Sequence, residues 1–188
     1  MIELKFARRG VLAGALSAAV APAAQAASGA GGSAADFVDQ ERALATAENK
    51  RLVVVFFASW CVWCRFMDML LADRTAARIL DPRFRFAHLR ALEHDEDQRA
   101  LQLNGANDVF ARYAAARNGL PFLVFLDANG DVVTTTISSA NDANIGFPVQ
   151  GFELDWFTEM LALAAPDLTA QDLATLRAIC VRLAPRRR

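Results

Sequence analysis

The strongest constraint on the fold is a segment in which an apolar strand runs straight into a helix that carries two cysteines. Residues 51–67 have the sequence RLVVVFFASWCVWCRFM. The β-branched and aromatic run Leu52–Phe57 is typical of a strand that is buried on both faces. A helical pattern begins directly after Cys61, so Cys61 and Cys64 are predicted to lie in the first turn of a helix that leaves a central strand.

This position gives the two cysteines a reason to be reactive. The free N–H groups and the positive end of the helix dipole favour a thiolate at Cys61. Cys64 follows one helical turn later, close enough to close a short disulfide with Cys61. We expect Cys61 to attack a partner's disulfide and Cys64 to resolve the mixed disulfide that results.

Other roles for a cysteine pair at this spacing fit the sequence less well. Haem attachment needs a histidine at position 65, where the chain has Arg65. Zinc needs about four ligands, and the two histidines, His88 and His94, are not spaced as ligands. A purely structural disulfide across so short a loop would remove little chain entropy. The redox role is therefore favoured, with no metal and no cofactor beyond the Cys61–Cys64 disulfide.

Two motifs resemble the thioredoxin superfamily. The segment Phe56–Cys64 resembles its active-site strand and helix. Downstream, Gly119–Phe125 (GLPFLVF) resembles the segment in which that family carries a cis-proline facing the cysteine pair. The resemblance extends over about residues 34–165 and implies an α/β, thioredoxin-like three-layer fold, in which helices flank a central mixed β-sheet.

The resemblance also implies which residues meet a protein partner. Trp60 is expected to shield the cysteines and to offer an apolar contact. Leu120 and Pro121 are expected to lie across from the sulfurs, where the backbone of Leu120 would pair with an incoming polypeptide. A simpler alternative for Pro121 is that it starts an edge strand. The segment Asn144–Pro148 either borders the same face or is an ordinary loop.

Two departures from the superfamily pattern bear on the direction of electron flow. Val55 stands six residues before Cys61, where the family usually has a buried aspartate that relays protons. Glu93 and Asp68 are candidate substitutes, although both are expected at the surface. The intervening Val62-Trp63 lacks the histidine of strongly oxidising relatives. The pattern WCVxC is similar to periplasmic thioredoxin-like disulfide reductase domains, which favours a reductive role.

The first residues are predicted to be a secretory signal peptide, residues 1–26. A basic start that ends at Arg8-Arg9 precedes the apolar run Val11–Val20, and Ala24–Ala26 offers an A-x-A cleavage site. The run is shorter than the roughly 20 residues that a spanning helix needs, so no stable membrane insertion is expected after cleavage. The export route, Sec or twin-arginine, stays open. The predicted destination is the periplasm, where a cysteine pair can be oxidised.

A single domain is expected after the signal peptide. Residues 27–33 form a glycine-rich, flexible lead-in, residues 34–184 the thioredoxin-like domain, and residues 185–188 a basic tail. Helices are predicted at 34–49, from 62 onward, in two pieces within 93–117, at 152–164 and at 169–183, and strands at 52–57, 83–92, 122–126 and 132–137. The last helix is an addition to the minimal family fold. In it Cys180 falls on the apolar stripe, which predicts burial, and in the first helix Phe37 and Leu44 are expected to face inward.

These features predict an exported thiol–disulfide oxidoreductase that exchanges disulfides with protein partners, with a membrane protein as a candidate electron donor. The net charge of −1 argues against a nucleic-acid partner. The competing hypothesis is a non-catalytic thioredoxin-like binding module in the cell envelope, which holds Cu(I) or presents a surface to a protein. Redox cycling with a dithiol would favour the enzyme, and stoichiometric metal would favour the binding module.

Overall fold

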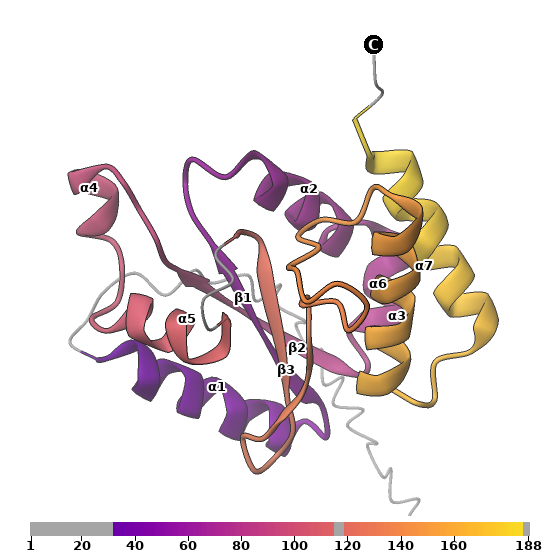
Figure 1. Cartoon of the computed structure of the whole chain (residues 1–188). Helices are drawn as coiled ribbons and strands as arrows, with labels where there is room; N and C mark the ends of the chain where they lie inside the picture. Colours follow the sequence, from indigo (N-terminus) through magenta and orange to yellow (C-terminus); the bar gives the residue numbers. More distant parts are fainter. Residues whose placement is uncertain (1–31, 115–118, 186–188) are drawn as a thin grey trace, which may run out of the picture.

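A four-stranded mixed sheet organises the part of the chain that the computed structural model describes, residues 32–114 and 119–185 (Figure 1). The predicted signal peptide and most of the lead-in lie outside these residues. The strand order is β2-β1-β3-β4. The strands are β1 (Arg51–Phe57), β2 (Phe84–Arg90), β3 (Phe122–Leu126) and β4 (Val132–Thr135). β1 is parallel to β2 and antiparallel to β3, and β3 and β4 form an antiparallel hairpin.

The central strand β1 is buried on both faces, as its sequence predicts. Its side chains alternate between two hydrophobic clusters, with Val53 and Val55 in one and Leu52, Val54 and Phe56 in the other. Both neighbours of β1 are strands, so its backbone groups are paired along both edges. A strand that is covered on both faces and paired along both edges can consist entirely of apolar residues.

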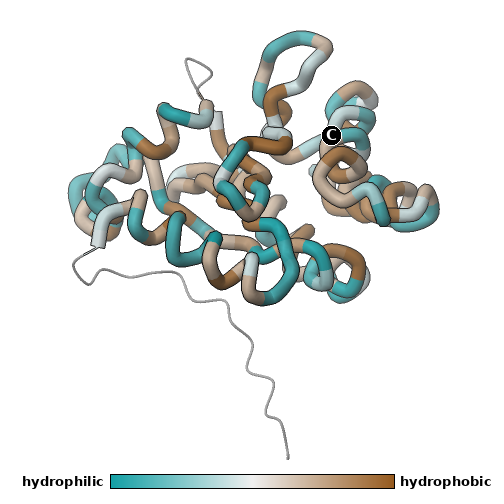
Figure 2. Tube along the Cα trace, turned by 90° about the horizontal axis from the view of Figure 1, so that it is seen from below, coloured by the Kyte–Doolittle hydropathy of each residue, from teal (hydrophilic) through white to brown (hydrophobic). Residues whose placement is uncertain are grey.

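Helices cover both faces of the sheet, which confirms the predicted three-layer α/β arrangement (Figure 1). The helices are α1 (Ala34–Ala47), α2 (Val62–Leu71), α3 (Arg74–Leu80), α4 (Glu96–Arg99), α5 (Ala106–Ala114), α6 (Gly151–Ala164) and α7 (Ala170–Leu183). Side chains of α1 and α5 join one cluster, and those of α3, α6 and α7 join the other. Along the helices the chain alternates between hydrophilic and hydrophobic residues, as expected for elements with one buried face (Figure 2).

The additional helix α7 packs against α6, α2 and α3. Its Leu176 and Cys180 are fully buried in the same cluster as Met67 and Leu70 of α2. Thr169 caps α7 through a reciprocal capping box with Asp172. The predicted burial of Cys180 is therefore confirmed.

Two local expectations were wrong. Helix α3 was not predicted; it begins after Asp73, whose Oδ1 accepts hydrogen bonds from the N–H groups of Thr75 and Ala76. In α1, Leu44 is 40% exposed, while Val38 and Ala45 face the core.

Within the described residues, no helix combines the length and the apolar character that crossing a membrane requires.

Candidate active site

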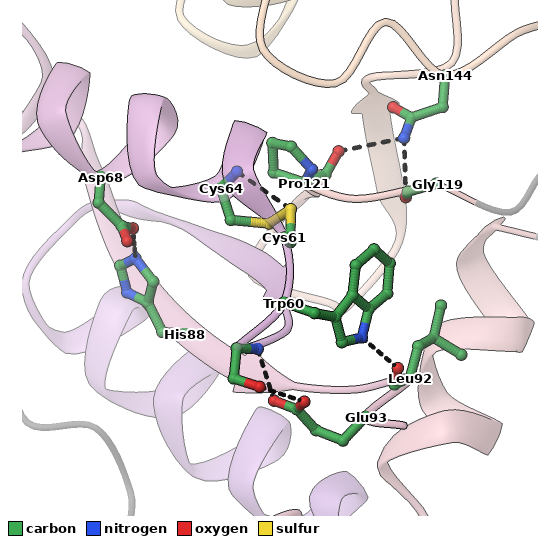
Figure 3. The surroundings of a disulfide bond; sticks show 11 residues. Trp60, Cys61, Cys64, Asp68, His88, Leu92, Glu93, Gly119, Pro121 and Asn144 are labelled. Carbon is green, nitrogen blue, oxygen red and sulfur yellow. Dashed lines mark hydrogen bonds and ion pairs between the residues drawn. A yellow bond between two sulfur atoms is a disulfide. The ribbon is translucent and has the colours of Figure 1, made fainter. Parts of the chain in front are cut away.

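Cys61 and Cys64 are joined by a disulfide at the beginning of α2 (Figure 3). Their Cα atoms are 5.3 Å apart. Cys61 is the N-cap of α2, and its Sγ accepts a 3.1 Å hydrogen bond from the N–H of Cys64. Both cysteines are only 3% exposed. The position at the first helical turn is the one predicted from the sequence.

The helix start explains how this pair could be activated once it is reduced. A thiolate at Cys61 would occupy the N-cap, where side chains normally accept a hydrogen bond from an unpaired backbone N–H. The N–H of Cys64 already points at this sulfur. The positive end of the helix dipole adds to the stabilisation of a negative charge there.

Trp60 lies beside the disulfide, and its ring is held by one hydrogen bond and one stacking contact (Figure 3). Its indole Nε1 donates a 2.8 Å hydrogen bond to the carbonyl oxygen of Leu92. Its ring stacks on His94, with ring centroids 4.7 Å apart and planes at 9°. Trp60 is nevertheless 45% exposed, and Val62 and Trp63 are exposed next to it. Exposed apolar side chains therefore lie next to the cysteines in the chain.

The Leu120–Pro121 peptide bond is cis, and Figure 3 shows Pro121 next to the disulfide. Asn144 holds this segment from the side: its Nδ2 donates to the carbonyl oxygens of Gly119 at 2.9 Å and Pro121 at 3.1 Å. Its Oδ1 accepts from the N–H of Gly146. The segment Asn144–Pro148 thus borders the proline, one of the two alternatives that the sequence left open.

A groove of about 690 Å³ runs along this border. Its walls include Trp63 from α2, Leu120 from the proline segment, Asn144 and Phe147 from the following loop, and Pro185 after α7. The rings of Trp63 and Phe147 stack at 6.5 Å with planes at 13°. The groove therefore joins the beginning of the cysteine helix to the loop after β4, and the end of α7 contributes to it.

Glu93 is buried, so the expectation that it is a surface charge was wrong. The residue is 5% exposed. Its carboxylate accepts hydrogen bonds from the N–H and the Oγ of Ser59, both at 2.7 Å, and from Arg90 Nη1 at 2.8 Å. Burial alone raises the pKa of this carboxyl, but the hydrogen bonds from Ser59 and the charge of Arg90 outweigh it, so the pKa lies below its ordinary value. One indication was present in the sequence, an acidic residue directly after a predicted strand, but it did not reveal the partner Ser59.

Asp68, the other acidic candidate, lies at the surface as expected. Its Oδ1 is 3.3 Å from Nε2 of His88, and both side chains are substantially exposed (Figure 3). In residues 32–114 and 119–185, no group of three or more His, Cys, Asp or Glu side chains is placed to hold a metal ion.

The fold and the cysteine pair at a helix start define the class of protein. A family model described as thioredoxin-like matches residues 33–128. The chain therefore belongs to the thioredoxin-like family. None of the curated proteins matches it significantly in sequence.

Several solved structures resemble the chain at low sequence identity. A disulphide isomerase from Xylella fastidiosa Temecula1 is 19% identical, with 77% of this chain and 88% of that chain covered and a TM-score of 0.44. A DsbH oxidoreductase is 21% identical, with 76% and 88% covered and a TM-score of 0.45. A thioredoxin from Thermus thermophilus is 20% identical, with 68% and 83% covered and a TM-score of 0.42.

Proposed function

We propose that the protein is a thiol–disulfide oxidoreductase that exchanges disulfides with other proteins through Cys61 and Cys64. The observation that carries this proposal is the disulfide at the first turn of α2, where Cys61 is the N-cap. Membership of the thioredoxin-like family supports it. A redox-active pair of this kind needs no further cofactor, because the two sulfurs store and release the electrons.

In the proposed reaction the reduced protein transfers two electrons to a disulfide of its partner. The Cys61 thiolate attacks one partner sulfur, which forms a mixed disulfide and releases the other partner sulfur as a thiolate. Cys64 then loses its proton and attacks the Cys61 sulfur, which closes the Cys61–Cys64 disulfide and releases the second partner sulfur. The partner gains two electrons, which come from the two sulfurs of the protein as they are oxidised to the disulfide. One of its two protons comes from Cys64 and the other from solvent.

The partner is proposed to bind where Trp60, Leu120 and Pro121 surround the pair. Trp60 offers an exposed apolar ring that is already oriented by its bond to Leu92. The Leu120–Pro121 segment is braced by Asn144, so a polypeptide that paired with Leu120 would meet a fixed backbone. A rigid binding edge loses little conformational entropy on association.

We further propose that the protein works in the periplasm as a reductase. Export is supported by the N-terminal signal pattern of residues 1–26. A reductive direction is supported by the Val62-Trp63 dipeptide, which places no positive charge between the cysteines. An exported reductase needs a continuing supply of electrons, and a membrane protein that carries them across from the cytoplasm would provide it.

The test is the reduction potential of the Cys61–Cys64 pair in the purified protein. The protein is equilibrated in graded thiol buffers, trapped by alkylation and counted by mass, with Cys61→Ser as the control that has no two-thiol transition. We expect a value near the thioredoxin figure of about −270 mV, together with dithiol-driven reduction of a protein disulfide. A value near about −120 mV would reverse the proposed direction. Absence of any reversible two-thiol transition would contradict the proposed oxidoreductase function and favour a binding module for Cu(I) or for a protein.

A further inference from the structure

A buried carboxylate lies behind the turn that leads into the cysteine pair. Glu93, whose side chain is 0% exposed, connects two segments that are far apart in the sequence: its two oxygens accept both hydrogen-bond donors of Ser59. Ser59 precedes Trp60 and Cys61 in the turn between β1 and α2. Burying an ionised group is costly unless every acceptor is paired, so a carboxylate here is a poor choice for simple packing.

The segment that carries Glu93 is itself held in a fixed shape. Leu92 has a φ of +57°, a conformation that non-glycine residues adopt only when the surroundings enforce it. The N–H of Leu92 donates to Asn107 Oδ1 at 2.9 Å, and that of Glu93 donates to Gln102 Oε1 at 2.8 Å. The carbonyl of Leu92 accepts from Trp60. The side chain of Glu93 therefore projects from a rigid support toward the turn.

The charge of Glu93 lies on the turn that leads into the redox pair. The carboxylate is ionised at neutral pH, since its hydrogen bonds hold its pKa below the ordinary value despite burial. Its counter-charge, Arg90, is bound in addition by Gln98 and lies over the ring of Phe57 at 5.2 Å. The other titratable side chains drawn around the disulfide, Asp68 and His88, lie against each other, with Oδ1 and Nε2 3.3 Å apart (Figure 3). Of these groups, the carboxylate is the one bonded directly to the turn before Cys61.

We propose that Glu93 is a positioning residue of the redox site, which fixes the Ser59–Cys61 turn and whose negative charge opposes formation of the Cys61 thiolate. This inference rests on the proposed redox function and deepens it. A less stable thiolate means a less stable reduced form, so the charge biases the pair toward giving electrons away. Glu93 holds the turn through its hydrogen bonds to Ser59, its charge acts on Cys61 electrostatically, and it does not take part in the exchange of sulfurs.

Replacement of Glu93 by glutamine separates charge from geometry. The amide oxygen of Gln can accept from Ser59 N–H, and its NH2 group can donate to Ser59 Oγ, because a hydroxyl both donates and accepts. The charge is lost, and Arg90 keeps its own. The pH profile of Cys61 alkylation in the reduced protein is expected to shift to lower pH by roughly half a unit in Glu93→Gln. An unchanged midpoint, or a shift to higher pH, would overturn the electrostatic part of the proposal.

The matched control is Glu96→Gln, which removes the same charge from an exposed position at the start of α4. Its midpoint is expected to stay within about a tenth of a unit of the wild type, since exposed charges are screened. A shift as large as that of Glu93→Gln would mean that overall charge, and not Glu93, controls Cys61.

The positioning part is tested by hydrogen exchange at the amide of Ser59. Glu93→Ala removes the acceptor of this amide and is expected to speed its exchange at least tenfold, while Glu93→Gln restores most of the protection. Ser59→Ala keeps the backbone bond and the charge, so it should retain both the protection and the wild-type midpoint. Equal exchange in Glu93→Ala and wild type would overturn the positioning role. The wild-type reduction potential is measured in parallel. A normal two-thiol transition, with no effect of the Glu93 variants on the alkylation midpoint or on Ser59 exchange, would contradict this inference alone. A missing two-thiol transition would contradict the proposed function itself.

Discussion

Trp60 and Leu92 are joined by a 2.8 Å hydrogen bond from the indole Nε1 to the backbone carbonyl oxygen, across the turn that precedes the cysteine pair. The bond orients a large side chain that remains 45% exposed. Because the ring is already fixed, a partner that covers it would not have to immobilise it. The same bond also anchors Leu92, the residue with a φ of +57°.

Trp60→Phe is expected to lower the free energy of unfolding by about 0.5–1 kcal/mol, since it removes this hydrogen bond and keeps an aromatic ring. The measurement is urea unfolding at constant m value. Trp63→Phe is the control, because in the described part of the chain the indole of Trp63 makes ring contacts with Phe66 and Phe147 and has no hydrogen-bond partner. An equal loss in both variants would show that ring size, and not the bond to Leu92, matters.

Asn144→Ala is expected to lower the free energy of unfolding by about 2 kcal/mol, because three hydrogen bonds to the backbone are lost together. The rate of protein-disulfide reduction should also fall, since the proline segment beside the cysteines loses its brace. Denaturant unfolding and a turbidity assay of insulin reduction measure the two effects. Asn141→Ala, which loses one exposed bond to the N–H of Ala143, is expected to leave both nearly unchanged. A normal rate in Asn144→Ala would contradict the role of the brace.

Cys180 is expected to make the protein sensitive to alkaline pH. Burial raises the pKa of its thiol from 9.0 to about 12. In the unfolded chain the thiol loses its proton near pH 9 while the folded protein retains it, so stability is intact below that pH and falls as the pH rises toward 12. Between pH 9 and pH 10.5 this group alone should cost about 1–2 kcal/mol.

The measurement is the free energy of unfolding of the fully oxidised protein at pH 8 and pH 10.5, with Cys180→Ala for comparison. The alanine variant loses the thiol and its part of the pH dependence, while Tyr113, whose pKa is raised mainly by burial, contributes equally to both proteins. The same pH dependence in both would refute the assignment to Cys180. In the native state at pH 8 this thiol should also resist alkylation until denaturant is added.

Asp73→Asn is expected to destabilise the protein at neutral pH and much less at pH 3. Bonds from the N–H of Ala76 and from Arg182 lower the pKa of Asp73 below 3.8. A lowered pKa means a contribution that is complete above about pH 4 and is lost as the pH falls through the folded value. Asparagine keeps an N-cap acceptor, so the change isolates the charge that links α3 to α7.

Unfolding curves at pH 7 and pH 3 give this comparison. The control is Asp155→Asn, which breaks the more exposed pair with Arg177 and should change little at either pH. A loss in Asp73→Asn that is equally large at both pH values would show that helix capping, and not the ion pair, is responsible.

Local sequence patterns predicted the elements whose burial is uniform. The unbroken, β-branched apolar run of β1 is typical of a strand buried on both faces, and the helical pattern directly after Cys61 places this residue at a helix start. Local sequence patterns did not predict burial or contacts where a residue is surrounded by parts of the chain that are distant in the sequence. Nothing near Glu93 in the sequence reveals that Ser59 will supply its donors, and Leu44 is exposed because small residues of α1 face the sheet instead. Asn144 could be placed beside Pro121 only once the hairpin and its loop were folded.

Because α7 packs against α2, the packing around α2 can be completed only after α7 has been synthesised. Helix α2 carries Met67 and Leu70 on its apolar side. This side packs in one cluster with Leu176 and Cys180 of α7, which come near the end of the domain in the sequence. A chain that has been synthesised only as far as α6 still lacks the residues that cover this side. The helix that carries the two cysteines would then lack its final packing. The last helix of the domain therefore completes the packing of the helix that carries the two cysteines, although most of the domain separates the two helices in the sequence.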